Sequence, residues 1–328
     1  MKYKVTKNIS LIAICLFLAF CGHSQRGSQR QAQVIAPTFD FETAEAQLAE
    51  LFAVVTRGEA ESIRYNANIR FLELLKNTLV EEGAFDHPFA NLGTQILQPP
   101  DRKFRMFNWI VRRDLGMEFF AVMMVRVEHA EEIRIIQLID ESETIFDRSN
   151  AILEANNWYG AHYRQVIQTE GNDGRRYYTL LGWNGNDPAV SRSIIEVMTF
   201  RPNGDPVFGA AIFTDERGRR ERFVRKVFEY ARRSSMILRY DLQAYREPAP
   251  TRRHPQRHQY VETNMIVFDH LVPQCRSGTR TSDMRGRREA YIPSGGVHHA
   301  YIWLDNRWTL KPDIRARMPA PEGQRRRR

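Results

Sequence analysis

The feature that most constrains the fold is a series of short apolar segments with a period of two, which begins after Pro99-Pro100 and continues to residue 312. The segments are rich in β-branched and aromatic residues, as β-strands are. Because no segment of helix length separates them, the pattern predicts a long antiparallel β meander, barrel-like or packed as a sandwich. Several connectors carry hairpin residues: Asn172-Asp173-Gly174, Asn184-Gly185-Asn186-Asp187, Asn203-Gly204-Asp205 and Asp305-Asn306.

Twelve segments fit this strand pattern. The segment at 222–230 also fits a helix, and we favour a strand because its neighbours are strands. The predicted strands are 104–111, 118–127, 132–139, 162–169, 176–183, 193–200, 208–213, 222–230, 235–242, 264–271, 298–304 and 307–312.

A helical pattern precedes the strands. Apolar residues recur at helical spacing on both sides of Arg57-Gly58, so we expect a helical hairpin that ends near Gly83. The expected fold class is therefore mainly β (α+β). The predicted division is a signal peptide at 1–25, a flexible leader at 26–37, the helical hairpin and linker at 38–98, an antiparallel β domain at 99–318 and a disordered basic tail at 319–328.

Residues 1–25 have the three parts of a secretory signal peptide: a basic start, an apolar run too short to span a bilayer comfortably, and a polar exit. We expect export to the periplasm, the outer membrane or the extracellular space, with no transmembrane segment after cleavage near Ser24 or Gln25. Lipid modification of Cys21 is the alternative, although Phe20 stands where a small residue is preferred. After cleavage Cys275 is the single remaining cysteine, so no internal disulfide is expected.

Three segments form a recognisable series: a K-F-R-x-x-x-W strand at 103–109, a strand like Y-Y-L-L-G-W at 177–183 and a closing Y-x-W-x-x-x-x-W-x-L hairpin at 301–310. In this order they resemble a group of uncharacterised secreted proteins of Bacteroidota. The resemblance covers about residues 40–318 and implies export to a Gram-negative envelope, with no activity or catalytic residue to carry over. The group has acidic residues in a P-D-G-x-Y-D-A-Y pattern. This chain has PSGGVHHAY at 293–301, so a role of those acids does not carry over.

No motif in the chain specifies a reaction: the nucleophile elbow, the Walker A loop, the dinucleotide fingerprint, HExxH and the EF-hand loop are all absent. The least implausible catalytic residues are Asp269 and His270, inside an apolar run, and Cys275. Neighbours on a strand face opposite sides, so one of the first two points inward. We favour structural pinning of a loop or strand by that residue over acid-base catalysis.

A structural role is also the favoured interpretation for two other groups of polar residues. The acidic cluster Asp140-Glu141-Glu143 is expected to cap a turn rather than to act as a glycosidase carboxylate pair. No metal or cofactor is expected, because the histidines of the last quarter lack the geometry of a metal site. They are His254, His258, His270, His298 and His299.

The stretch WNGND at 183–187 has two interpretations. Asn-Gly supplies the two residues with positive φ that a tight primed turn needs, and it recurs at Asn203-Gly204, so we favour a hairpin tip. The alternative places Trp183 and Asn184 at the mouth of a ligand site.

Positive charge is the remaining signal of function. From Glu216 to His258 the chain has 13 Arg and Lys against 5 Asp and Glu, and it ends in four arginines. Alternation would place Arg220, Arg222 and Lys226 on one side of a strand, with Arg219 and Arg225 on the other. Two interpretations fit this pattern: the charges protect a strand edge from aggregation, or they form a binding surface. We favour the first.

We therefore expect an exported cell-envelope protein that is a non-catalytic binding or structural module. The alternatives are a hydrolase of an envelope polymer and a structural partner in a surface assembly. The expected partners are an anionic envelope glycan or lipid, or an envelope protein. Nucleic acid is not expected, because an exported protein rarely meets it.

Overall fold

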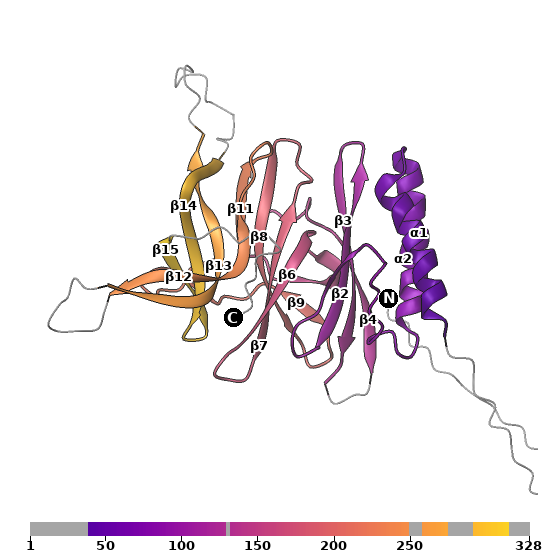
Figure 1. Ribbon diagram of the computed structural model, residues 1–328, viewed down its shortest axis with the longest axis horizontal. Helices are drawn as coiled ribbons and strands as arrows, with labels where there is room; N and C mark the ends of the chain where they lie inside the picture. Colours follow the sequence, from indigo (N-terminus) through magenta and orange to yellow (C-terminus); the bar gives the residue numbers. More distant parts are fainter. Residues whose placement is uncertain (1–38, 129–131, 249–257, 275–290, 315–328) are drawn as a thin grey trace, which may run out of the picture. The chain divides into compact units, whose positions relative to one another are not determined.

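The computed structural model describes residues 39–128, 132–248, 258–274 and 291–314 (Figure 1). The predicted signal peptide, leader and basic tail, together with Cys275, lie outside the described residues.

Two helices open the described chain and confirm the predicted helical hairpin: α1 (Phe41–Arg57) and α2 (Glu61–Leu79). Asp40 caps α1, because its side chain accepts a hydrogen bond of 3.1 Å from the Thr43 N–H. Gly58 ends this helix. Its N–H donates to the Val54 carbonyl, and a Cβ atom at this position would lie 2.8 Å from that oxygen.

The strands form three open sheets in which almost all pairs are antiparallel, as the mainly β prediction required. The first sheet has the order β1-β2-β3-β4: β1 (Gln95–Leu97), β2 (Phe104–Arg113), β3 (Gly116–Arg126) and β4 (Ile133–Leu138). The second has the order β5-β9-β8-β7-β6, with β11 also on β8: β5 (Leu153–Glu154), β6 (His162–Glu170), β7 (Arg176–Asn184), β8 (Val190–Phe200), β9 (Pro206–Phe208) and β11 (Lys226–Ala231).

The third sheet has the order β10-β15-β14-β13-β12: β10 (Phe213–Thr214), β12 (Leu238–Pro248), β13 (His258–Pro273), β14 (Tyr291–Leu304) and β15 (Arg307–Ile314). The short β10–β15 pair is parallel.

One predicted strand, 208–213, does not exist as a unit. Phe208 ends β9 in the second sheet and Phe213 begins β10 in the third. Gly209 between them has a φ of 104°, which a strand residue does not adopt. The apolar run therefore crosses from one sheet to another.

The hairpin connections form as expected, although their turn types differ. Gly174 and Gly204 have φ values of 74° and 83°, and the residue before each glycine keeps a negative φ, so a single positive-φ residue closes each turn. Asp305 and Asn306 have φ values of 48° and 61° between β14 and β15. The connection at Asp305-Asn306 is therefore a two-residue primed turn. The sequence predicted this turn type for the Asn-Gly connections, which do not adopt it.

Alternating faces of the strands build the layers. Phe107 and Trp109 of β2 pack with the helices, while Phe104 and Met106 of the same strand belong to the core shared with the second sheet. In β8, the even positions Ile194 and Met198 face this shared core, and the odd positions face the third sheet. The second sheet thus has one face toward the first sheet and one toward the third.

The K-F-R-x-x-x-W strand has a structural role. The Arg105 side chain is buried and donates to the carbonyls of the loop after α2, including that of His87 at 2.6 Å. The Trp109 indole N–H donates to Asn68 of α2 at 2.7 Å. The motif therefore fastens the helical hairpin to the first sheet.

Candidate functional site

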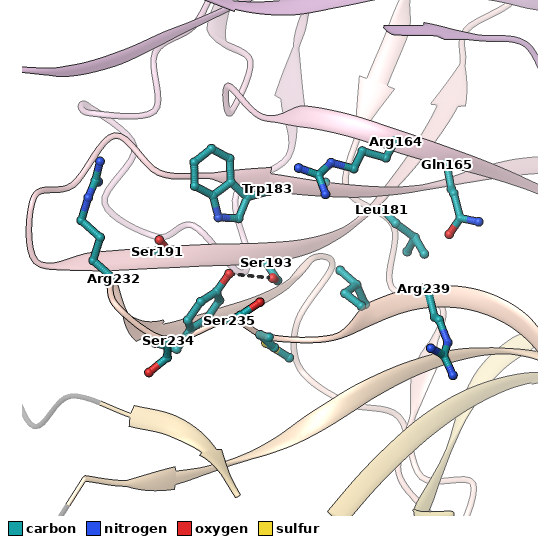
Figure 2. A pocket seen from close by; sticks show the side chains of 14 residues that line it. Arg164, Gln165, Leu181, Trp183, Ser191, Ser193, Arg232, Ser234, Ser235 and Arg239 are labelled. Atoms are coloured by element: carbon teal, nitrogen blue, oxygen red, sulfur yellow. Dashed lines mark hydrogen bonds between the residues drawn. The ribbon is translucent and has the colours of Figure 1, made fainter. Parts of the chain in front are cut away.

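A cleft with a volume of about 440 Å³ lies on the face of the second sheet that turns toward the third sheet (Figure 2). Ser191 and Ser193 of β8 line it, at the odd positions that continue into the core between these two sheets. Its other walls come from β6, β7, the end of β11 and the segment that leads into β12. The cleft thus depends on segments far apart in the sequence.

The cleft is cationic. Arg164, Arg232 and Arg239 line it, and no Asp or Glu is among the described residues that line it. In Figure 2, Arg232 lies at one end, while Arg164 and Arg239 lie toward the other, with Trp183 between. Arg164 is exposed and has no carboxylate partner within the part of the chain that the structure describes. The Arg239 Nε is 3.7 Å from Asp241, so its charge is partly compensated.

Arg232 also shapes the loop between β7 and β8. One of its guanidinium nitrogens donates to the carbonyls of Gly185 and Asp187, both at 2.6 Å. The charge remains positive, because carbonyl groups do not neutralise it. Arg232 therefore fixes the loop and adds to the cationic field of the cleft.

Aromatic rings and hydroxyl groups complete the cleft. Trp183 is half-buried at its wall, and the Ser193 hydroxyl donates to the Tyr230 hydroxyl at 3.3 Å, the bond drawn in Figure 2. Ser234 and Ser235 also line it. An indole beside hydroxyl and guanidinium donors suits a ligand that has both apolar faces and anionic groups.

The stretch WNGND is both a hairpin connection and a wall of the cleft. It joins β7 to β8, but Gly185 does not have the positive φ of a primed turn, so the predicted reason for this glycine was wrong. A Cβ atom at Gly185 would lie 2.1 Å from the Trp183 ring. The glycine is needed because the indole packs against its backbone.

Asn184 points away from this cleft and helps to line a smaller one of about 330 Å³. Its amide group donates to the Gly160 carbonyl at 2.6 Å, and its oxygen accepts from the Asn186 N–H at 3.1 Å. Asn186 in turn accepts from the Met117 N–H at 2.8 Å, which ties the loop to the first sheet. Asn184 therefore has a structural role here, while Trp183 lies at the cationic cleft.

Asp269 and His270 do not line the cationic cleft. Asp269 is buried, accepts from the Ile237 N–H at 2.7 Å and lies 2.8 Å from the His298 Nδ1. Ile237 lies between two cleft-lining residues, Met236 and Leu238. Asp269 thus pins the cleft wall, which is the structural role that the sequence favoured.

His270 is exposed and forms a 2.9 Å hydrogen bond with His299, whose Nδ1 accepts from the Asp313 N–H at 3.0 Å. Burial, together with the charges of nearby histidines, lowers the pKa of the His299 ring. The pair lies beside a break in register after Asp269, between β13 and β14. Asp269 and His270 are therefore in different hydrogen-bonded groups, although they are neighbours in the chain.

The arginine-rich run differs from the single strand that the sequence predicted. The strand β11 begins at Lys226, and Arg219 lies in a turn where it pairs with Asp215 at 2.6 Å. Arg225 is fully buried in an ion pair with Glu196 of β8, so it was wrongly assigned to a surface. Two arginines later in this basic region, Arg232 and Arg239, reach the cleft.

The acidic cluster caps a turn. Asp140 accepts backbone N–H groups from Phe119, Ser142 and Gly160 at 3.0 to 3.2 Å. Within the described residues no three His, Cys, Asp or Glu side chains gather closely enough to hold a metal ion. The same part of the chain has no helix that is long and apolar enough to cross a membrane.

Comparison with protein-family models, curated proteins and solved structures found no match to this chain. Sequence reasoning identified Trp183 as an alternative ligand contact. It missed Arg164, Ser191 and Ser193, because a single polar residue in an alternating strand gives no signal of the cleft it faces. It also missed Ser234 and Ser235, which lie in the connection between β11 and β12.

Proposed function

We propose that this protein is a non-catalytic binding protein for an anionic glycan of the cell envelope, and that the cationic cleft is its binding site. The observation that carries the proposal is the combination in one cleft of three arginines, Trp183 and several hydroxyl groups, with no carboxylate contributed by the part of the chain that the structure describes. Its volume of about 440 Å³ is in the range of small-ligand sites.

The chemistry of the lining residues fits this ligand class. Guanidinium groups form strong, charge-assisted hydrogen bonds with carboxylate, phosphate and sulfate groups. An indole offers an apolar surface to the C–H face of a sugar ring. Arginines at both ends of the cleft, with Trp183 between, favour a short stretch of an anionic chain over a single charged sugar.

The same lining residues favour binding over hydrolysis. A glycoside hydrolase needs two carboxyl groups that flank the scissile bond. The described residues contribute neither a carboxyl group nor a histidine to the lining of the cleft. Asp269 accepts a backbone N–H beneath the cleft wall, so it supports the site without facing it.

We also propose that the protein is exported, as the basic and apolar N-terminus and the resemblance to secreted proteins of Bacteroidota suggest. Cell fractionation with N-terminal sequencing of the mature chain is expected to find a chain that starts near Ser24 or Gln25 in the envelope or medium. Fatty-acid labelling in the same experiment would detect a lipidated Cys21. A cytoplasmic chain that retains Met1 would contradict export.

Binding is tested with trigalacturonate, which carries three carboxylates, and with the neutral galactose trisaccharide. We expect trigalacturonate to bind in titration calorimetry, and its affinity to fall with added salt because exposed charges are screened. Arg164→Gln should weaken binding about tenfold, since it removes a charged hydrogen-bond donor without affecting the core.

Arg233→Gln is the matched control, because Arg233 is exposed, lies beside Arg232 and is not a lining residue. We expect it to bind like the native protein. Equal affinity for both trisaccharides, or equal loss in the two variants, would contradict the proposed site. Tight binding of lipopolysaccharide micelles without binding of trigalacturonate would assign the cleft to a lipid headgroup instead.

A further inference from the structure

A second cleft differs from the first in its chemistry. It is a groove of about 500 Å³ between α2 and the neighbouring strands β3 and β4 of the first sheet. Tyr65, Ile69 and Ile139 line it and are 40%, 51% and 41% exposed, which is high for apolar side chains that face one groove. The helix therefore covers the first sheet only in part.

The groove is preformed. Phe120 in its wall stacks on Trp109 at 5.8 Å, and Asn68 of α2 holds the Trp109 indole by the 2.7 Å hydrogen bond described above. Lys76 of α2 donates to Gln137 of β4 at 3.2 Å and bridges the groove. A ligand would meet fixed walls, so little ordering of the protein would oppose binding.

The edge of the first sheet lies beside this groove. β4 is the last strand of the sheet and pairs with β3 on one side. Its end is covered, because the Ile139 N–H donates to the Ala155 carbonyl at 2.7 Å and the Trp158 N–H donates to Ile139 at 2.9 Å. For 133–138, no second strand lies along the outer edge within the described parts of the chain. An open strand edge is a template for another extended chain.

The charge of the groove indicates what that chain carries. Among the described residues that line it, Glu73, Glu118 and Asp140 are acidic and Lys76 is the one basic residue. Asp140 accepts three backbone N–H groups, and Lys76 is hydrogen-bonded to Gln137. Glu118 is half-buried and lies 3.9 Å from Arg113, so the exposed Glu73 offers the most accessible charge. On a protein with a formal net charge of +9, this groove is locally acidic.

We propose that the groove binds an extended segment of a partner protein that pairs with the open edge of β4 and places apolar and basic side chains against α2. Successive side chains of a strand alternate, so every second residue of the partner would face the groove. This interaction is independent of the anionic-glycan cleft and would attach such a partner to a glycan-bound protein.

The probe is an eight-residue peptide in which threonine alternates with valine and lysine, so that one face carries both apolar and cationic groups. Fluorescence anisotropy of the labelled peptide with the full chain should show saturable binding. The same peptide with glutamate in place of lysine should bind at least about tenfold more weakly, because the exposed carboxylate of Glu73 and the partly compensated one of Glu118 repel it. A peptide with proline at the threonine positions should not bind, since it cannot pair with a strand edge.

The double variant Ile69→Ser with Glu73→Lys changes two groove residues that are exposed on α2, and we expect it to weaken binding of the lysine peptide about tenfold. Ile63→Ser is the matched control, because Ile63 is 49% exposed on the same helix and does not line the groove. No binding, equal binding of the lysine and glutamate peptides, or equal affinity of the double variant would overturn the proposal. A dimer in sedimentation that Ile69→Ser dissociates would assign the groove to a second copy, which also overturns it.

Discussion

Glu196→Leu is expected to lower the free energy of unfolding by about 3 to 5 kcal/mol, because it leaves the guanidinium of Arg225 buried without its counter-charge. Both side chains are fully buried in an ion pair between β8 and the residue before β11. Glu196 also accepts the Val197 N–H at 3.0 Å, and Arg225 donates to the Arg148 carbonyl at 2.7 Å. Burial raises the pKa of the Glu196 carboxyl, which its hydrogen-bond donors oppose.

The double variant Glu196→Leu with Arg225→Met removes both charges and should be more stable than Glu196→Leu alone. It will not regain full stability, because the Arg148 carbonyl loses its donor. Urea unfolding followed by circular dichroism measures all three proteins. A single variant that is as stable as the native chain, or a double variant that is less stable than the single, would refute an ionised buried pair.

The free energy of unfolding is expected to fall by about 2 kcal/mol between pH 7 and pH 4 through His162 alone. Burial, and secondly the charge of Arg164, lowers the pKa of the His162 ring from 6.5 to about 4. The unfolded chain therefore takes up the proton first. The stabilising contribution is complete above pH 6.5 and is lost as the pH falls toward 4. The full difference between the folded and unfolded pKa values of His162 corresponds to about 3 kcal/mol. The expected loss of stability is smaller, about 2 kcal/mol, because solvent screens the partly exposed ring.

His162→Phe removes the titrating group, so the difference in stability between native chain and variant should change with pH across this interval. Urea unfolding of both proteins at steps from pH 7.5 to pH 4 measures it. Parallel stability curves would show that the ring titrates alike in the folded and unfolded chains, contrary to this expectation.

Much of the fold could be predicted because its signals are local. The alternation in β2, β3 and β7 appears within each segment, and Arg57-Gly58 breaks the helical pattern where α1 ends. The division of the run at 208–213 could not be predicted. Its apolar residues belong to two different sheets, and a pattern of hydrophobicity does not reveal the positive φ of Gly209.

The candidate site was less predictable because it depends on distant pairing. Arg164 and Arg239 line one cleft only because β6 lies near the start of β12, where the Tyr240 N–H donates to the Gln165 side chain at 2.9 Å. The burial of Arg225 likewise depends on Glu196, 29 residues away in sequence. A count of charges across a segment cannot separate a buried arginine from one that faces a cleft.

A crystal structure of the protein with trigalacturonate is the most direct test of the proposed binding function. We predict that carboxylates of the ligand lie within hydrogen-bond distance of Arg164, Arg232 or Arg239, with a sugar ring against Trp183. A ligand bound elsewhere on the protein, or a cleft that stays empty at saturating trigalacturonate, would contradict the assignment of the cleft as an anionic-glycan site.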